Sequence, residues 1–173
     1  MRVGHGYDSH RFAEGRRLVL GGVGIPGERG LEGHSDADAV AHALTDALLG
    51  AAGLGDIGQH FPPTDPRWKD ADSLQLLAQV VGLLQERDFR IVNVDVTVVA
   101  ERPRIAPHVL PMRERLAVVL GVPLAHVSIK GKTNEGLGWI GRGEGIAAFA
   151  VALIDDSLDP AARHTRYPPA GTG

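Results

Sequence analysis

Residues 33–55 read GHSDADAVAHALTDALLGAAGLG, and this stretch decides the fold. Its apolar residues recur at helical spacing, and glycines at positions 53 and 55 end the pattern. The apolar residues are Val40, Ala43, Leu44, Ala47, Leu48 and Ala51. The stretch therefore predicts the first helix of the chain, with one apolar side that must be covered by a second layer of structure.

The residues before this helix predict strands. Residues 2–11 and 17–23 read as two strands, and the Gly/Pro-rich residues 21–33 read as turns or an exposed loop. We expect the two strands to form a hairpin that is followed by a long loop.

Helices and strands alternate after residue 55. The patterns predict helices from Asp72 or Ser73 to residue 84 and over 107–120, and strands over 91–99, 127–132 and 146–154. The order ββααβαββ predicts an α/β (α+β) sandwich, in which one mixed sheet has helices packed on one face. Residues 1–155 are expected to form a single domain, and residues 156–173 a flexible, non-catalytic tail.

The composition excludes several classes of protein. A net charge of −3 over 173 residues, with no long basic run, argues against nucleic-acid and membrane partners. The absence of Cys excludes disulfides, thiolate zinc sites and Cys nucleophiles, so any metal must bind to His and carboxylates. The longest apolar stretch, residues 146–154, is too short to span a bilayer, and the N-terminus lacks the apolar core of a signal peptide. We therefore expect a cytoplasmic protein with small-molecule partners.

Asp8 and His10 stand two residues apart in the first predicted strand. Their side chains point to the same face of that strand, about 7 Å apart at the backbone. His42 of the first helix could add a third ligand and leave a fourth zinc position open, as a catalytic site requires. The alternative is a pair of surface polar residues and a helix histidine that is hydrogen-bonded in place.

Residues 34–38 lead straight into the first helix. Ser35 and Asp38 have the spacing of a capping box, which indicates a good helix start. The free N–H groups of that start would also attract a phosphate, to which His34 could donate a hydrogen bond. Asp46 lies one turn after His42, where it would orient the His42 ring or stand as an exposed helix carboxylate.

The glycine-rich residues 136–145 match nucleotide-binding motifs only in part. Residues 136–141 satisfy G-x-G-x-x-G but continue into a strand instead of a helix, and His126 stands where a P-loop needs Gly. The segment is expected to form a tight loop beside a ligand or a neighbouring chain, or an ordinary long turn. Just before it, Lys132, Thr133 and Glu135 are typical of a phosphate and magnesium site, although a solvated strand end has the same residue types.

Four segments carry a resemblance to a known family: RVGHGYDSHRF (2–12), GHSDADAVAHALTDALLGAAGLGDIGQHFPPTDP (33–66), NVDVTVVAERPRIAPH (93–108) and TNEGLGWIGRGEGIA (133–147). Together they resemble the 2-C-methyl-D-erythritol 2,4-cyclodiphosphate synthase family of the non-mevalonate isoprenoid pathway. The resemblance extends over roughly residues 1–154 and leaves out only the tail.

The resemblance implies a homotrimer of α/β subunits with active sites between neighbouring subunits. It implies zinc on Asp8, His10 and His42, and magnesium or manganese on Glu135 together with the substrate phosphates. The implied catalytic residues are His34 and Thr133, which would align the phosphates and stabilise the transition state.

The resemblance also implies a set of substrate contacts. Those near the methylerythritol moiety are Ser35, Asp38, Asp56, Gly58 and Phe61. Those of the cytidine and phosphate pocket are Ala100, Pro103, Arg104, Ile105, Ala106, Lys132 and Asn134. Further implied substrate contacts are Ile57, Asp65, Trp139 and Arg142. Arg142 and Glu144 would also face an axial cavity that holds an isoprenoid diphosphate. The chain departs from the usual family residues at Pro63, Arg104, Lys132 and Trp139.

The implied substrate is 4-diphosphocytidyl-2-C-methyl-D-erythritol 2-phosphate, whose own 2-phosphate attacks the β-phosphorus and expels cytidine monophosphate. This reaction needs no enzyme base, only positioning and charge neutralisation. Two other functions stay open. One is a zinc hydrolase with Asp38 or Asp46 as general base, and the other is a non-catalytic trimeric sensor of isoprenoid diphosphates. The predicted metal ligands argue against the sensor, because a sensor does not need an open metal site.

Overall fold

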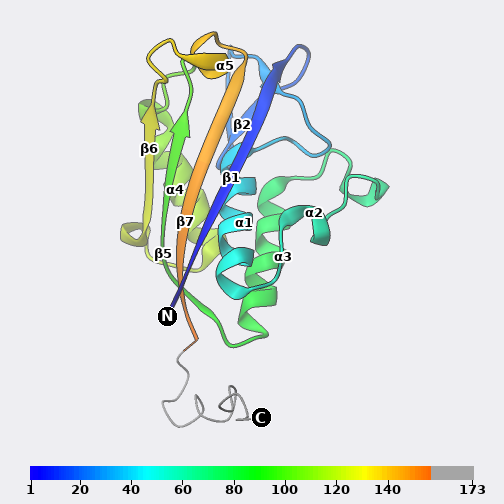
Figure 1. Cartoon of the computed structure of the whole chain (residues 1–173), viewed down its shortest axis with the longest axis vertical. Coiled ribbons are helices and arrows are strands. Elements are labelled where there is room, and N and C mark those ends of the chain that lie inside the picture. Colours follow the sequence, from blue (N-terminus) through cyan, green and yellow to red (C-terminus); the bar gives the residue numbers. More distant parts are fainter. Residues whose placement is uncertain (157–173) are drawn as a thin grey trace, which may run out of the picture.

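The computed structural model describes residues 1–156, which form one mixed sheet with helices on one face (Figure 1). The strands of the sheet, in spatial order, are β4 (Gly30–Leu31), β1 (Arg2–Ala13), β7 (Gly145–Asp155), β5 (Arg90–Val99) and β6 (Val127–Lys132). Strands β5 and β6 pair in parallel and the other neighbours pair antiparallel. The predicted fold class, a mixed sheet with helices packed on one face, is therefore confirmed.

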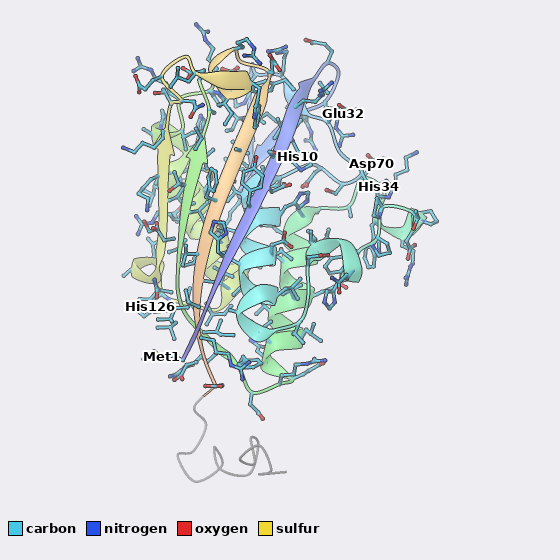
Figure 2. All side chains as sticks on the ribbon, in the orientation of Figure 1. Met1, His10, Glu32, His34, Asp70 and His126 are labelled. Atoms are coloured by element: carbon cyan, nitrogen blue, oxygen red, sulfur yellow. The ribbon has the colours of Figure 1, made fainter. Side chains whose placement is uncertain are left out.

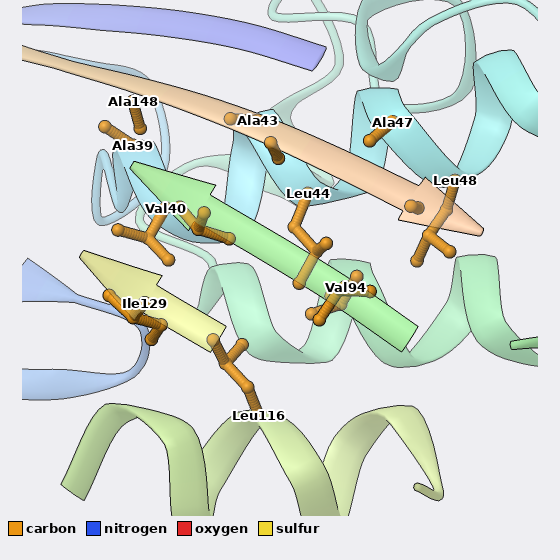
Figure 3. Close-up of a cluster of buried hydrophobic side chains, with 14 of the residues drawn as sticks. Ala39, Val40, Ala43, Leu44, Ala47, Leu48, Val94, Leu116, Ile129 and Ala148 are labelled. Carbon is orange, nitrogen blue, oxygen red and sulfur yellow. The ribbon is translucent and has the colours of Figure 1, made fainter. Parts of the chain in front are cut away.

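Three long helices cover the sheet: α1 (Ala39–Ala52), α3 (Ser73–Gln85) and α4 (Val109–Leu120). The shorter helices are α2 (Ile57–His60), α5 (Gly138–Gly141), η1 (Pro66–Trp68), η2 (Ala106–His108) and η3 (Leu124–His126). The predicted third helix is thus η2 followed by α4. The core lies between the sheet and the long helices, where Leu44 and Leu48 of α1 and Leu116 of α4 meet Val94 and Ile129 of the sheet (Figure 3).

The predicted hairpin between residues 2–11 and 17–23 is wrong. Residues 18–25 form a small sheet of their own, in which β2 (Leu18–Leu20) pairs with β3 (Val23–Ile25). The turn between them is Gly21-Gly22, with φ angles of 53° and 74°, which a two-residue hairpin turn of this kind requires. Strand β1 instead pairs along most of its length with β7, from Arg2 opposite Ile154 to Arg11 opposite Gly145. Glycines in the predicted second strand were the signal for this turn.

Helix α1 lies directly against β1 because the facing side chains are small. A Cβ at Gly4 would stand 2.0 Å from the carbonyl oxygen of Ala47, and one at Gly6 would stand 1.9 Å from that of Ala43. The helix backbone therefore occupies the space that side chains would fill on this face of the strand. Asp8 and His10 follow on the same face, because side chains alternate along a strand.

The opposite face of the sheet carries exposed apolar side chains. Val3 and Tyr7 of β1 are 68% and 47% exposed, and Phe149 and Val151 of β7 are 39% and 43% exposed. The rings of Tyr7 and Phe149 lie 5.0 Å apart between centroids. We refer to Val3, Tyr7, Phe149 and Val151 as the open sheet face.

The two ends of the described chain lie together. Strand β7 runs back to the start of β1, where the Asp156 carboxylate accepts hydrogen bonds from the N-terminal amine and from Arg2 Nε. Asp156 is the first residue of the predicted flexible tail, and the rest of that tail lies outside the described residues. No helix within residues 1–156 is long and apolar enough to cross a membrane.

Candidate active site

Asp8, His10 and His42 come together where β1 passes the first turns of α1. His10 Nε2 and His42 Nδ1 lie 2.8 and 3.0 Å from Asp8 Oδ2, and 3.2 Å from each other. All three side chains are mostly buried, with exposed fractions between 13% and 23%. The prediction that strand and helix bring these three residues together is confirmed.

The three ligand atoms fit a tetrahedral metal ion. Ligands at about 2.0–2.1 Å from zinc lie about 3.3 Å from one another at the corners of a tetrahedron. The observed edges of 2.8–3.2 Å require only a small outward adjustment of the side chains. These residues form the one group of three metal-type side chains among residues 1–156. The donor set therefore suits a divalent metal and leaves a fourth position for another ligand.

The charges of the group favour an ionised carboxylate between two imidazoles. Burial acts to raise the pKa of Asp8, but hydrogen bonds from His10 and His42 outweigh it and hold that pKa well below its ordinary value. Burial likewise acts to lower the pKa of His10, and the Asp8 carboxylate outweighs it, so the pKa of His10 is raised. Asp8 is thus available as an anionic ligand throughout the neutral range.

The ring nitrogens of both histidines that face away from Asp8 have partners. His10 Nδ1 donates to the carbonyl oxygen of Glu32 at 2.6 Å, and Figure 2 shows the two residues at the same end of β1. His42 Nε2 lies 2.9 Å from Ser73 Oγ and 3.1 Å from Ser35 Oγ. Each imidazole therefore has one nitrogen bound to the protein and one facing Asp8.

The prediction that Asp46 orients the His42 ring is wrong. Asp46 Oδ1 accepts a hydrogen bond from the backbone N–H of Ile57 at 2.7 Å, which ties α1 to the start of α2. In the described part of the chain, the hydrogen bonds of the His42 ring go to Asp8, His10, Ser35 and Ser73. Asp46 lies one turn after His42 on α1, but its carboxylate is directed toward residue 57. The packing of α3 against α1 brings Ser73 to the His42 ring instead.

Asp38 is a structural residue, which corrects its predicted roles as substrate contact and as general base. It has no exposed surface, and its carboxylate accepts hydrogen bonds from four backbone N–H groups, those of Gly21, Gly22, Val40 and Ala41. It caps α1 and also anchors the Gly21-Gly22 turn. The predicted helix start is therefore confirmed, but the predicted capping box is wrong, because the N-cap of α1 is Asp38 and not Ser35.

A cavity of about 200 Å³ opens beside the triad. His10 and His42 line it together with His34 and Ser35 on one side, and its remaining lining is mostly apolar: Ile57, Gly58, Phe61, Pro63, Trp68 and Leu76. We call it the triad cavity. His34 Nε2 donates to the carbonyl oxygen of Asp65 at 3.3 Å, so the ring is tied to the loop that closes this side. The two nearby acidic residues of the predicted site are helix caps, since Asp56 begins α2 and Asp65 begins η1 and pairs with Arg67.

A second cavity, of about 250 Å³, lies at the ends of β5 and β6. Its lining includes the predicted nucleotide residues Ala100, Pro103, Arg104, Ile105, Ala106, Lys132 and Thr133. We call it the loop cavity. It shares no lining residue with the triad cavity, so one chain does not bring the two groups of predicted residues together.

The turn after β6 is held by Glu101. Its Oε1 accepts hydrogen bonds from the backbone N–H groups of Asn134 at 2.9 Å and Gly136 at 3.2 Å. Between them, Glu135 has a φ of 50°, and its carboxylate accepts a 2.5 Å hydrogen bond from Thr133 Oγ1. Glu135 is exposed and is not part of the metal-type group around Asp8.

The last two predicted substrate residues lie beyond this turn. Trp139 is half-buried in α5. Arg142 pairs with Glu144 at 2.6 Å and lines a further cavity with Phe12 and Arg29.

Sequence reasoning missed three residues that the structure places next to functional groups: Asp36, Ser73 and Glu101. Ser73 stands at the start of a predicted helix, where a serine is ordinarily a cap. Only the tertiary contact between the α1 and α3 starts reveals that its hydroxyl reaches His42.

Comparisons with known proteins agree with this geometry. A family model described as the YgbB family matches residues 1–155. The chain belongs to the YgbB family. The resemblance predicted from the four sequence segments is thereby confirmed.

Two curated relatives and one solved structure carry the same name. The chain is 68% identical over 154 residues to the 2-C-methyl-D-erythritol 2,4-cyclodiphosphate synthase of Symbiobacterium thermophilum, covering 89% of this chain and 98% of the relative. It is 59% identical over 157 residues to the protein of that name from Syntrophomonas wolfei, covering 91% and 100%. A solved structure of a 2C-methyl-D-erythritol-2,4-cyclodiphosphate synthase in a CDP-bound form superposes with a TM-score of 0.82 at 41% identity, covering 89% of this chain and all of that one.

Proposed function

We propose that this chain converts 4-diphosphocytidyl-2-C-methyl-D-erythritol 2-phosphate into 2-C-methyl-D-erythritol 2,4-cyclodiphosphate and cytidine monophosphate. One observation carries the proposal: His10 and His42 belong to the metal-type triad and also line the cavity that contains His34 and Ser35. A metal-bound phosphate would therefore lie beside hydrogen-bonding groups and an apolar pocket. The names of the relatives supply the substrate. The enzyme would be a phosphorus–oxygen lyase that acts in the cytoplasm.

The proposed resident metal is zinc, held by Asp8, His10 and His42. Bound there, zinc would supply Lewis-acid polarisation of a phosphate. The protein's part is to present one carboxylate and two imidazoles in a group that is already assembled. Such preorganisation is what positions a phosphate for transfer.

The reaction balances without an enzyme base. An ionised oxygen of the 2-phosphate forms a bond to the β-phosphorus, and the bond from that phosphorus to the bridging oxygen breaks, so that cytidine monophosphate leaves as an anion. The work left to the chain is orientation and charge neutralisation. His34 would donate to the phosphates from the rim of the triad cavity, and Ile57, Gly58 and Phe61 would contact the methylerythritol carbons. Because Asp38 is buried and Asp46 is bound to a backbone N–H, neither is placed to serve as the base of a hydrolase.

The loop cavity is the proposed site of the cytidine and its phosphates. Its lining combines residues 100–101 and 103–106 with Lys132 and Thr133, a mixture of polar groups and apolar surface that suits a base and a diphosphate. Glu135 would hold magnesium or manganese together with the substrate phosphates. Asn134, Trp139 and Arg142 are proposed contacts around it.

The proposed assembly is a homotrimer with an active site between neighbouring subunits. The substrate carries cytidine at one end and methylerythritol at the other, and in one chain the two cavities that suit these ends share no residue. The open sheet face provides apolar surface for contact between copies. The same assembly would bring Arg142 and Glu144 to an axial cavity with room for an isoprenoid diphosphate.

Product analysis tests the proposed reaction. The chain, zinc and magnesium are incubated with the substrate, and phosphorus NMR follows the products. The expected result is a cyclic diphosphate and cytidine monophosphate in equal amounts. Release of inorganic phosphate, or of an open-chain diphosphate, would establish a hydrolase and overturn the proposal.

A further inference from the structure

We propose that Asp36 and Ser73 form a hydrogen-bond relay that fixes the tautomer of His42 and so directs His42 Nδ1 to the metal. Both would be positioning residues, since they act on the ligand and do not touch the ion. The inference rests on the metal site of the proposed function, which it extends from the ligands to the groups behind them.

The direction of the hydrogen bonds follows from what each group can donate. Ser73 Oγ donates to Asp36 Oδ1 in a very short hydrogen bond, and the Asp36 carboxylate can only accept. The backbone N–H of Ser73 donates to the other oxygen, Oδ2, at 3.2 Å. A hydroxyl has one hydrogen, and here it is used on Asp36. Toward His42 Nε2, at 2.9 Å, Ser73 Oγ must therefore accept, so Nε2 carries the hydrogen.

With the Nε2 hydrogen held on Ser73, Nδ1 is the nitrogen left to bind a metal ion, and in the metal-free chain it donates to the Asp8 carboxylate, which can only accept. That nitrogen faces Asp8 Oδ2 at 3.0 Å and His10 Nε2 at 3.2 Å, which is the centre of the triad. His10 has the opposite arrangement, because its Nδ1 donates to the Glu32 carbonyl and its Nε2 faces the centre. The two rings thus present different nitrogens to one point, and each has a protein acceptor behind it.

Ser35 alone cannot set this tautomer. Its hydroxyl lies 3.1 Å from His42 Nε2 and 3.3 Å from Ser73 Oγ, and it accepts from the backbone N–H of Ala37. Within residues 1–156 no carboxylate is hydrogen-bonded to Ser35 Oγ, so its hydrogen is free to point toward His42. The Asp36 carboxylate can only accept, so it fixes Ser73 as the acceptor of the His42 hydrogen bond.

The relay is built into the fold where the loop before α1 meets the start of α3. Asp36 N–H donates to the Ala71 carbonyl at 3.1 Å, and Asp70 N–H donates to the His34 carbonyl at 2.8 Å. These bonds hold Asp36 against Ser73, which is 1% exposed. Away from bulk water a hydrogen bond is stronger and an unpaired group costs more, so the buried Ser73 hydroxyl is held between its partners.

The first test is which nitrogen of His42 carries a hydrogen in the zinc-loaded chain. Long-range nitrogen–proton NMR spectra of the nitrogen-15-labelled protein distinguish the nitrogen that carries a hydrogen from the nitrogen that binds zinc. The expected result is Nε2–H for His42 and Nδ1–H for His10. In Ser73→Ala, the His42 signals should shift toward a mixture of the two. A wild-type His42 that is protonated on Nδ1 overturns the relay.

The second test is zinc affinity, measured by competition with a chromophoric chelator. Ser73→Ala should weaken zinc binding by roughly 10- to 100-fold, the usual effect of losing the group behind a ligand. Asp36→Asn provides a second variant in case Ser73→Ala does not fold, and it should weaken zinc binding in the same direction. The matched control is Thr45→Val, which removes a hydroxyl that is equally buried on α1 and donates only to the Ala41 carbonyl.

The outcomes separate the relay from the proposed function. Ser73→Ala and Thr45→Val with equal zinc affinities overturn the relay while the metal site stands. A wild-type chain that binds no zinc overturns the metal site of the proposed function. Weakened zinc binding in Ser73→Ala and Asp36→Asn, but not in Thr45→Val, supports both.

Discussion

Gly6 of β1 lies against the backbone of α1 so closely that a Cβ on it would stand 1.9 Å from the carbonyl oxygen of Ala43. Ala43 directly follows His42, and Gly6 stands two residues before Asp8 on the same strand face. The contact therefore sets the distance between two of the three metal-type residues. Gly6 has no side chain, and this absence lets Asp8 and His42 come close enough to share a metal ion.

Gly6→Ala should damage both stability and metal binding. The added methyl group must push α1 away from β1, and overpacking of this kind costs about 1–3 kcal/mol of unfolding free energy. The same displacement moves His42 away from Asp8, so zinc affinity should fall as well. Gly24→Ala is the matched control, because its Cβ would meet nothing within 4 Å in strand β3. Chemical denaturation and zinc titration measure the two effects, and a Gly6→Ala protein that behaves like Gly24→Ala would contradict this account.

Asp38→Asn should lower stability more than any loss of a surface cap. An amide nitrogen would face one of the N–H groups that now donate to the carboxylate, and a buried unpaired donor costs about 1–3 kcal/mol in addition to the weakened helix cap. Asp56→Asn is the control, since Asp56 caps the short exposed helix α2. Thermal unfolding compares them. Equal melting temperatures would show that the Asp38 carboxylate does not hold the Gly21-Gly22 turn and α1 together.

The positions of the metal-type residues could be predicted from the sequence because each depends on one local pattern. The alternation along β1 put Asp8 and His10 on one face, and the apolar stripe of α1 turned His42 toward them. The hydrogen-bond partners of side chains could not be predicted where those partners lie far apart in the sequence. Asp46 was one helical turn from His42 and bonded instead to Ile57, whereas Ser73 reached His42 from another helix. Hydrogen bonds of this kind depend on how elements pack, which helical spacing does not encode.

Glu101→Ala should impair nucleotide binding without unfolding the chain. Its carboxylate holds the N–H groups of Asn134 and Gly136, and its loss frees the turn that carries Thr133 and Glu135. A displacement of about 1 Å at reacting groups can cost roughly 100-fold in turnover. Glu101→Gln retains an acceptor oxygen and should keep more of the activity. Calorimetric titration with CDP and steady-state kinetics measure the effects, with the exposed Glu114→Ala on α4 as control. Unchanged CDP affinity and turnover in Glu101→Ala would contradict the positioning role.

Glu135→Gln and Asp46→Asn should separate the two proposed metal sites. Glu135 is outside the triad, so its substitution should leave zinc affinity unchanged, reduce turnover and be partly rescued by excess magnesium. Asp46 holds the start of α2, whose residues Ile57 and Gly58 line the triad cavity. Asp46→Asn should therefore loosen that wall of the cavity and raise KM, with little change in zinc affinity and no rescue by magnesium. Each metal is titrated separately into both variants. A loss of zinc from Glu135→Gln would place Glu135 in the zinc site and refute the separation.

Val151→Lys should convert the proposed trimer into a monomer that still binds zinc. Val151 lies on the open sheet face, and an ammonium group there opposes burial against a second copy. All three triad residues come from one chain, so zinc binding should survive, whereas turnover should fall steeply because the triad and loop cavities would no longer meet across an interface. Val118→Lys is the control, since Val118 is 82% exposed on α4, which packs on the other side of the sheet. Sedimentation velocity gives the mass, and kinetics on the same samples give the turnover. A fully active monomer, in the variant or in the wild type, would mean that one chain contains the whole active site.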